Sequence, residues 1–190
     1  MKGYIKELPN FIDLSFVKDL ASKILTEEWY NMPDPFALHN FTDQMVIIAE
    51  DNITLNMIRN QYPKLAPTLK LMKCSKGSWL THVDKHRVSA VNIPVFNCDH
   101  TKVTRFFTGG QEVDSIEGSF GEIYREWKSN EYLTYIKDAD NLFDHILTVP
   151  TLVNTSKPHN IINTSDSIRV MLSWEYQDTF ETAEADFERI

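Results

Sequence analysis

The stretch "LTHVDKHRV", residues 80–88, places a histidine and an aspartate two positions apart, at His82 and Asp84. On a β-strand, residues i and i+2 point to the same face, so an imidazole and a carboxylate would share one side. Such a pair supplies two ligands of a 2-His-1-carboxylate metal site, which needs one more histidine. Taken alone, the pair fits the polar start of a strand equally well.

A third ligand is indicated by the spacing around His159. The chain has six histidines, and only His159 is followed ten residues later by an arginine, Arg169. The segment "HNIINTSDSIR" has the pattern of a strand, a turn at "SDS" and the start of a second strand. We expect antiparallel neighbours that aim both side chains into one barrel, where the guanidinium would clamp a carboxylate with two hydrogen bonds.

From about residue 69 onward, short segments of high strand propensity follow one another. They are rich in Val, Ile, Thr, Phe and Tyr and are separated by Gly, Pro, Asn, Asp and Ser. Eight such segments predict a sandwich or barrel. The segments are "LKLMKCS", "VSAVNIPVF", "KVTRFFT", "YLTYIK", "HILTV", "TLVNTS", "HNIINTS" and "IRVMLSWEY".

The N-terminal part has a different texture. Apolar residues recur at helical spacing after Asp13, a good N-cap residue, and predict a helix over 14–27. A second helix is predicted over 53–61, and the apolar run at 44–51 is typical of a strand. We expect these helices to pack on one of the sheets.

Two further segments are expected to lie outside the regular strands. Residues 108–131 hold four of the six glycines and predict a long surface loop with one helical turn, or a lid over a site. The acidic residues 179–190 predict a solvated tail or a final helical turn. The prediction is one domain over 1–190, with a helical buttress and a leading strand in 1–65 and the β core in 66–178.

Composition narrows the classes of partner. The 190 residues carry a formal net charge of −8, which is unfavourable for a surface that must neutralise phosphates, so we expect no nucleic-acid partner. No apolar run approaches the length needed to span a bilayer, and the first residues lack the apolar core of a signal peptide. We expect a cytoplasmic protein with Cys74 and Cys98 reduced.

The constellation His82-x-Asp84, His159 and Arg169 resembles the signature of the Fe(II)- and 2-oxoglutarate-dependent oxygenases. The resemblance covers roughly residues 70–176, and "VPTLVNTSKPH" is similar to the segment that leads to that family's distal histidine. Within the family, "HVDKHRVSAVNIPV" and "RVMLSW" are most similar in character to the aspartyl/asparaginyl hydroxylase and free-proline hydroxylase branch. The resemblance implies a double-stranded β-helix, the cupin-like jelly roll, flanked here by N-terminal helices.

The resemblance also implies cofactors and roles. Fe(II) would be held by His82, Asp84 and His159, and the 2-oxoglutarate cosubstrate by Arg169. With O2, such an enzyme hydroxylates its substrate and releases succinate and CO2. The carboxylate of Asp84 favours hydroxylation, because family halogenases have a small residue at this position.

One departure concerns the second 2-oxoglutarate contact. Many members have Arg-x-Ser at the clamp, whereas this chain has Met171 two residues after the arginine. A hydroxyl partner is then expected from Ser173 or Thr104, with Asn92 as a further candidate near the site. Candidate residues that would orient the metal ligands are Lys85, His86, Asn92 and Asn154.

The substrate stays open at this stage. A small molecule, amino acids included, and a peptidyl side chain both fit, and Arg87 and Arg105 are each either a substrate contact or a surface charge. Two other functions compete with the oxygenase. One is a cupin-like metal-dependent isomerase or hydrolase that does not use 2-oxoglutarate, and the other is a non-catalytic binding barrel. The sequence leaves the oligomeric state open.

Overall fold

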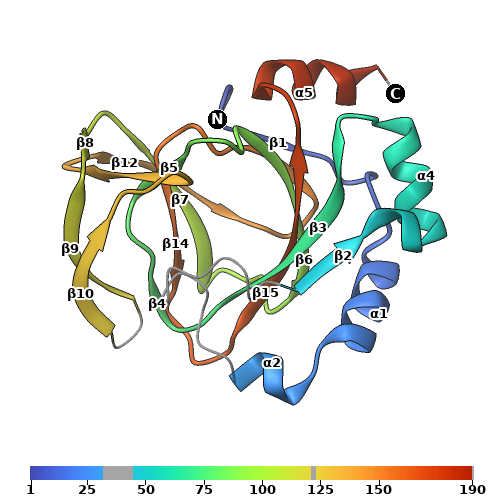
Figure 1. Ribbon diagram of the computed structural model, residues 1–190, viewed down its shortest axis with the longest axis horizontal. Helices are drawn as coiled ribbons and strands as arrows, with labels where there is room; N and C mark the ends of the chain where they lie inside the picture. Colours follow the sequence, from blue (N-terminus) through green and yellow to red (C-terminus); the bar gives the residue numbers. More distant parts are fainter. Residues whose placement is uncertain (32–44, 121–122, 190) are drawn as a thin grey trace.

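The computed structural model describes residues 1–31, 45–120 and 123–189. Two antiparallel sheets curl toward each other and form its body (Figure 1). The first sheet has the order β1 (Ile5–Glu7), β13 (Thr151–Asn154), β6 (Ser89–Phe96), β15 (Arg169–Tyr176), β3 (Leu65–Cys74) and β2 (Met45–Ile48). The second has the order β12 (Asp140–Ile146), β7 (Lys102–Thr108), β14 (His159–Asn163), β5 (His82–Asp84), β11 (Leu133–Lys137) and β8 (Gln111–Val113), with β4 (Gly77–Ser78) paired to β14.

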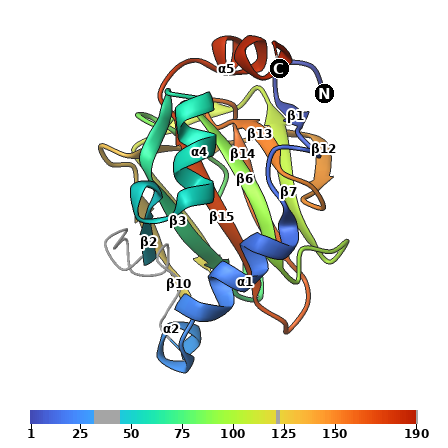
Figure 2. The ribbon, with the colours of Figure 1, turned by 90° about the vertical axis from the view of Figure 1, so that its right-hand side faces the viewer.

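Helices α1 (Leu14–Ile24) and α4 (Ile53–Gln61) lie over the outer face of the first sheet (Figure 2). The short α2 (Glu27–Asn31) and the C-terminal α5 (Phe180–Glu188) lie at the two ends of that face, and a 3-10 turn at Ala49–Asp51 precedes α4. Asp13 caps α1 by accepting a hydrogen bond from the Ser15 amide, as its residue type predicts. Val17 and Ala21, one helical turn apart, pack with Leu71 and Leu172 of the sheet. The predicted packing of helices on one sheet is confirmed.

A second core lies between the two sheets. Side chains alternate along β3, so that Leu69 and Leu71 pack on the helix side, whereas Met72 and Cys74 belong to the inner cluster. The inner cluster joins both walls, since Trp79 and Ile161 come from the side of the second sheet. The site described below is built on this inner face.

The predicted pairing of the two strands around "SDS" is wrong. β14 pairs with β7 and β5 in the second sheet, whereas β15 pairs with β3 and β6 in the first. Because β3 and β6 are hydrogen-bonded to the two edges of β15, β14 cannot pair with it, and the turn carries the chain from one sheet to the other. His159 and Arg169 therefore enter the barrel from facing walls and not from neighbouring strands.

The predicted loop over 108–131 is also wrong where the structure describes it. The segment forms β8 and the hairpin of β9 (Ser115–Phe120) and β10 (Ile123–Lys128). Trp127 is 2% exposed and anchors the hairpin in the inner cluster, donating from Nε1 to the Gly118 carbonyl at 3.1 Å. A Cβ at Gly118 would overlap Leu80, so the missing side chain lets the hairpin approach the segment that leads to His82. Residues 121–122 lie outside the described residues.

The acidic end is a packed helix and not a solvated tail. Thr179 caps α5, and Phe180 and Ala183 are buried against the first sheet. Asp186 accepts a hydrogen bond from the Tyr176 hydroxyl at 2.5 Å and pairs with Lys64 at 3.2 Å. Charge counting along the sequence missed the apolar face that docks this helix.

The first predicted helix is shorter than expected, because α1 ends at Ile24, and the run at 44–51 divides into β2 and the 3-10 turn.

Candidate metal centre

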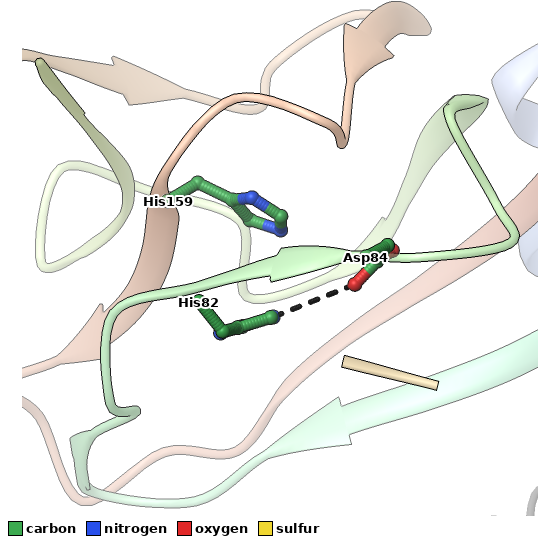
Figure 3. A group of neighbouring side chains, drawn as sticks. All are labelled: His82, Asp84 and His159. Atoms are coloured by element: carbon green, nitrogen blue, oxygen red, sulfur yellow. Dashed lines mark ion pairs between the residues drawn. The ribbon is translucent and has the colours of Figure 1, made fainter. Parts of the chain in front are cut away.

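Two neighbouring strands of the second sheet bring His82, Asp84 and His159 together (Figure 3). His82 and His159 are directly opposite each other across β5 and β14, with ring centroids 4.5 Å apart. Asp84 lies two residues along β5 and points to the same face as His82, as strand alternation predicts. One ligand atom from each residue falls within 4.8 Å of the other two. The three side chains predicted from spacing therefore form one cluster.

The backbone fixes both imidazole rings in the same way. His82 Nδ1 donates to the Leu80 carbonyl and His159 Nδ1 to the Lys157 carbonyl, each at 2.8 Å. Since a carbonyl only accepts, both protons are on Nδ1 and the lone pairs are on Nε2. His82 Nε2 lies 3.7 Å from Asp84 Oδ1. Metal-binding histidines are oriented by this kind of hydrogen bond from the other ring nitrogen.

Arg87 occupies the other oxygen of Asp84. Its Nε and Nη2 donate to Asp84 Oδ2 at 3.1 and 2.9 Å, which leaves Oδ1 facing the histidines. Its Nη1 donates to Ser173 Oγ at 2.8 Å, and that hydroxyl donates to Asn92 Oδ1 at 2.7 Å. The backbone carbonyl of Arg87 accepts from Thr155 Oγ1. Asp84 is thus set to bind a metal through one oxygen.

The electrostatics favour a neutral-imidazole, ionised-carboxylate donor set. Burial lowers the pKa of both histidines, and that of His159 falls to about 4. Burial raises the pKa of Asp84, but the neighbouring positive charges, that of Arg87 foremost and those of His159 and His82 after it, outweigh burial together with the hydrogen bonds from Arg87, so the pKa is lowered. Two nitrogen lone pairs and one carboxylate oxygen, deprotonated at neutral pH, fit a divalent transition metal such as Fe(II).

Arg169 lies on the inner face of β15 and is 1% exposed. Nη1 and Nη2 make only long contacts, both at 3.4 Å, to Thr104 Oγ1, and Nη2 lies 3.5 Å from Met171 Sδ. In the described part of the chain, its Nε has no hydrogen-bond partner and no carboxylate pairs with it. A buried cation without an anion is costly, so this position is suited to an anionic ligand.

Thr104 connects Arg169 to the histidine side of the barrel. It is opposite Ile161 on β14, two residues from His159 and on the same face. Its placement beside Arg169 fits its prediction as a cosubstrate contact. Ser173 and Asn92 instead lie at the Arg87 end of the inner face, bonded to each other, so the structure separates the four predicted cosubstrate residues into two groups.

Sequence reasoning overlooked one buried histidine in this region. His145 on β12 is opposite Thr104 and is 6% exposed, with Nε2 3.2 Å from Thr151 Oγ1. Burial lowers the pKa of His145, and the charge of Arg169 acts in the same direction against the opposing charge of Glu7. The local sequence gives no signal for this burial, because His145 is the one buried residue of β12 while the apolar Leu142 and Ile146 of the same strand are exposed.

The remaining predicted site residues lie away from the metal-ligand cluster or make contacts elsewhere. Arg105 alternates to the outer face of β7 and pairs with Asp144 at 2.6 Å. Among the candidates for orienting the ligands, Lys85 donates to the Asn130 carbonyl, His86 is exposed, and Asn154 donates to the Gly3 carbonyl. The two backbone carbonyls and Arg87 orient the ligands instead. Both cysteines are free thiols.

Comparison with solved structures identifies the fold. The chain superposes on the crystal structure of a Pseudomonas putida prolyl-4-hydroxylase with a TM-score of 0.53 over 93% of this chain and 94% of that one, at 11% sequence identity. The fold is jelly-roll-like. The mainly β architecture with flanking helices predicted from the sequence is confirmed. No family model matches the sequence, and no curated protein does. In the described ranges, no helix is long and apolar enough to cross a bilayer.

Proposed function

We propose that this protein is an Fe(II)- and 2-oxoglutarate-dependent dioxygenase that hydroxylates a small molecule or a peptidyl side chain. The observation that carries the proposal is the convergence of His82 Nε2, His159 Nε2 and Asp84 Oδ1 inside a jelly-roll-like barrel. Three ligands on one face of an octahedral ion leave the opposite face for cosubstrate and O2. The likeness to a prolyl-4-hydroxylase supports the same class of chemistry.

The roles of the chain's own residues follow from their contacts. His82, His159 and Asp84 would hold Fe(II), with Arg87 keeping Asp84 Oδ2 away from the metal. Arg169 would bind the distal carboxylate of 2-oxoglutarate, with Thr104 at its side. Together with 2-oxoglutarate and O2, the iron would supply the oxidation, with succinate and CO2 as products. The apolar side chains beside Arg169, namely Met72, Trp79, Ile161 and Met171, would exclude water from the cosubstrate.

The role of Arg169 distinguishes the proposed dioxygenase from a metal-dependent isomerase or hydrolase built on the same barrel. If Arg169 binds 2-oxoglutarate, Arg169→Met should raise the Kd of 2-oxoglutarate by about 10–100-fold, since a charge-assisted hydrogen bond is worth about 1.5–3 kcal/mol. Replacing a buried, unpaired cation by an apolar side chain of similar length leaves folding intact or improves it. The affinity for the metal should not change.

The measurement is anaerobic titration of the Fe(II)-loaded protein with 2-oxoglutarate, followed by succinate release once O2 is admitted. Arg105→Met is the matched control, because its guanidinium is on the outer face of the barrel. A wild-type protein that binds Fe(II) but not 2-oxoglutarate would overturn the proposal. Full metal-dependent activity in Arg169→Met would favour the isomerase or hydrolase.

A further inference from the structure

Lys70 places a third cation on the inner face of the barrel, beside the candidate metal centre. It alternates with Leu69 and Leu71, which pack under the helices, and shares its face with Met72 of the inner cluster. Across the sheet it is directly opposite Ser173, the residue to which Arg87 donates. Strand register therefore sets the Lys70 side chain next to the Arg87 guanidinium.

The anions nearest to Lys70 in the described residues, Glu175 and Asp84, act on its ammonium group only through space. Lys70 makes no hydrogen bond and no ion pair there, although it is half-buried. Burial lowers its pKa, and the charge of Arg87 lowers it further, against weaker opposing effects of Glu175 and Asp84. Asp84 is already bonded by Arg87. Half-burying an ammonium next to a guanidinium is unfavourable unless a ligand brings negative charge to both.

Arg87 has donors to spare for such a ligand. Of the five N–H groups of an arginine, it uses one on Nε, one on Nη2 and one on Nη1. One N–H on each terminal nitrogen stays available. The strand partner of Lys70 on the other side, Val46 of the edge strand β2, is 54% exposed, so the position is reachable from solvent.

We infer that Lys70 and Arg87 together bind a carboxylate of the substrate, next to the candidate iron ligand Asp84. The inference rests on the proposed function and narrows it to substrates with a carboxylate close to the oxidised carbon. Arg169 is held by Thr104 on the far side of Met171, so the two cationic positions lie at separate points along β15. The carboxylates of substrate and of 2-oxoglutarate therefore have different partners.

The test uses the full chain loaded with Fe(II) and 2-oxoglutarate. Free L-amino acids and small dicarboxylic acids are screened, each beside its carboxamide, for stimulation of succinate formation. We expect stimulation by an acid and not by its amide. Lys70→Met should raise the concentration of that acid needed for half-maximal stimulation by about 10–100-fold. Lys70→Arg should recover most of the loss, and Lys137→Met, which removes an exposed lysine on β11, should change nothing.

Three outcomes would overturn the inference. The first is a panel in which no acid stimulates succinate formation more than its amide does. The second is a Lys70→Met variant that needs the same acid concentration for half-maximal stimulation as the wild type. The third is a Lys70→Met variant in which only the affinity for 2-oxoglutarate is weakened, which would assign Lys70 to the cosubstrate. Failure of the proposed function is seen separately, as a wild-type protein that does not bind 2-oxoglutarate. In that case calorimetric titration of the Mn(II)-loaded protein with the same acids and amides still decides whether Lys70 binds a carboxylate.

Discussion

The two oxygens of Asp84 lie in different environments, and this difference shapes the candidate metal centre. Oδ2 accepts two hydrogen bonds from Arg87, while Oδ1 faces His82 Nε2. A carboxylate held in this way is ionised before any metal arrives and cannot rotate to bind through both oxygens. Arg87 thus positions a ligand without being one, and groups of this kind tune metal affinity.

Arg87→Met should weaken metal binding by about 10–100-fold, because Asp84 loses both its charge partner and its fixed orientation. The Kd of Mn(II) can be measured by competition with a chelator. Arg105→Met is the matched control, since it also breaks an Arg–Asp pair, at the outer surface, where such pairs contribute about 0–1 kcal/mol. Equal Mn(II) affinity in the two variants would show that Arg87 does not orient Asp84.

Residues at this scale were predictable where the signal was local. His82 and Asp84 follow from strand alternation, and His159 with Arg169 from a spacing within one segment. The contacts of Arg87, Lys70 and His145 could not be found in this way. Each depends on which residue lies opposite on another strand, and that register is set by pairing between distant segments.

At the scale of elements, strand propensity located the strands well but not their partners. Both β14 and β15 were placed correctly, yet the turn between them crosses from sheet to sheet, because β3 and β6 already flank β15. The glycines of 108–131 suggested a loop, whereas Gly118 serves close packing against Leu80. In α5 the acidic residues hid the two apolar positions, Phe180 and Ala183, that dock the helix.

The docking of α5 predicts a response to acid. The hydrogen bond from Tyr176 and, after it, the contact with Lys64 lower the pKa of Asp186, although partial burial opposes this. A carboxyl with a depressed pKa in the folded state contributes stability that is complete above its unfolded value, about 3.9, and is lost as the pH falls through the folded value. Stability should therefore decline from about pH 5 downward.

Asp186→Asn should lower the free energy of unfolding at pH 7 by about 1–2 kcal/mol, as expected for a hydrogen bond to a charged group that is partly exposed. Its deficit relative to wild type should shrink as the pH falls below 4, because the wild-type carboxylate is then protonated too. Urea titrations at several pH values measure this. Asp19→Asn on the exposed face of α1 is the control. A deficit independent of pH would rule out the charge as its cause.

At the scale of the whole molecule, the inner face concentrates positive charge in an acidic protein. The chain carries a net −8, whereas the inner face bears Arg87 and Lys70 near Asp84, and Arg169 at a separate position on β15. A divalent metal adds two more positive charges to this face, and anionic ligands then compensate them. The proposed function consequently makes the binding of metal and of 2-oxoglutarate mutually reinforcing, since each improves the electrostatic environment of the other.

This coupling should be visible in thermal unfolding. Mn(II) at about 100 times its Kd should stabilise the folded protein by about 2.7 kcal/mol, which corresponds to a rise of about 5–10 °C in Tm for a chain of this size. Adding 2-oxoglutarate together with Mn(II) should raise Tm by more than the sum of the separate shifts, and excess EDTA should abolish the whole effect.

His159→Gln, which removes a ligand nitrogen from the cluster, should abolish the Mn(II) shift, whereas Lys137→Met should keep it. A wild-type Tm that does not respond to Mn(II) or Fe(II) would identify the barrel as a binding module without a metal. If Mn(II) raises Tm but 2-oxoglutarate does not raise it further, the metal centre would stand and the assignment of 2-oxoglutarate to Arg169 would be wrong.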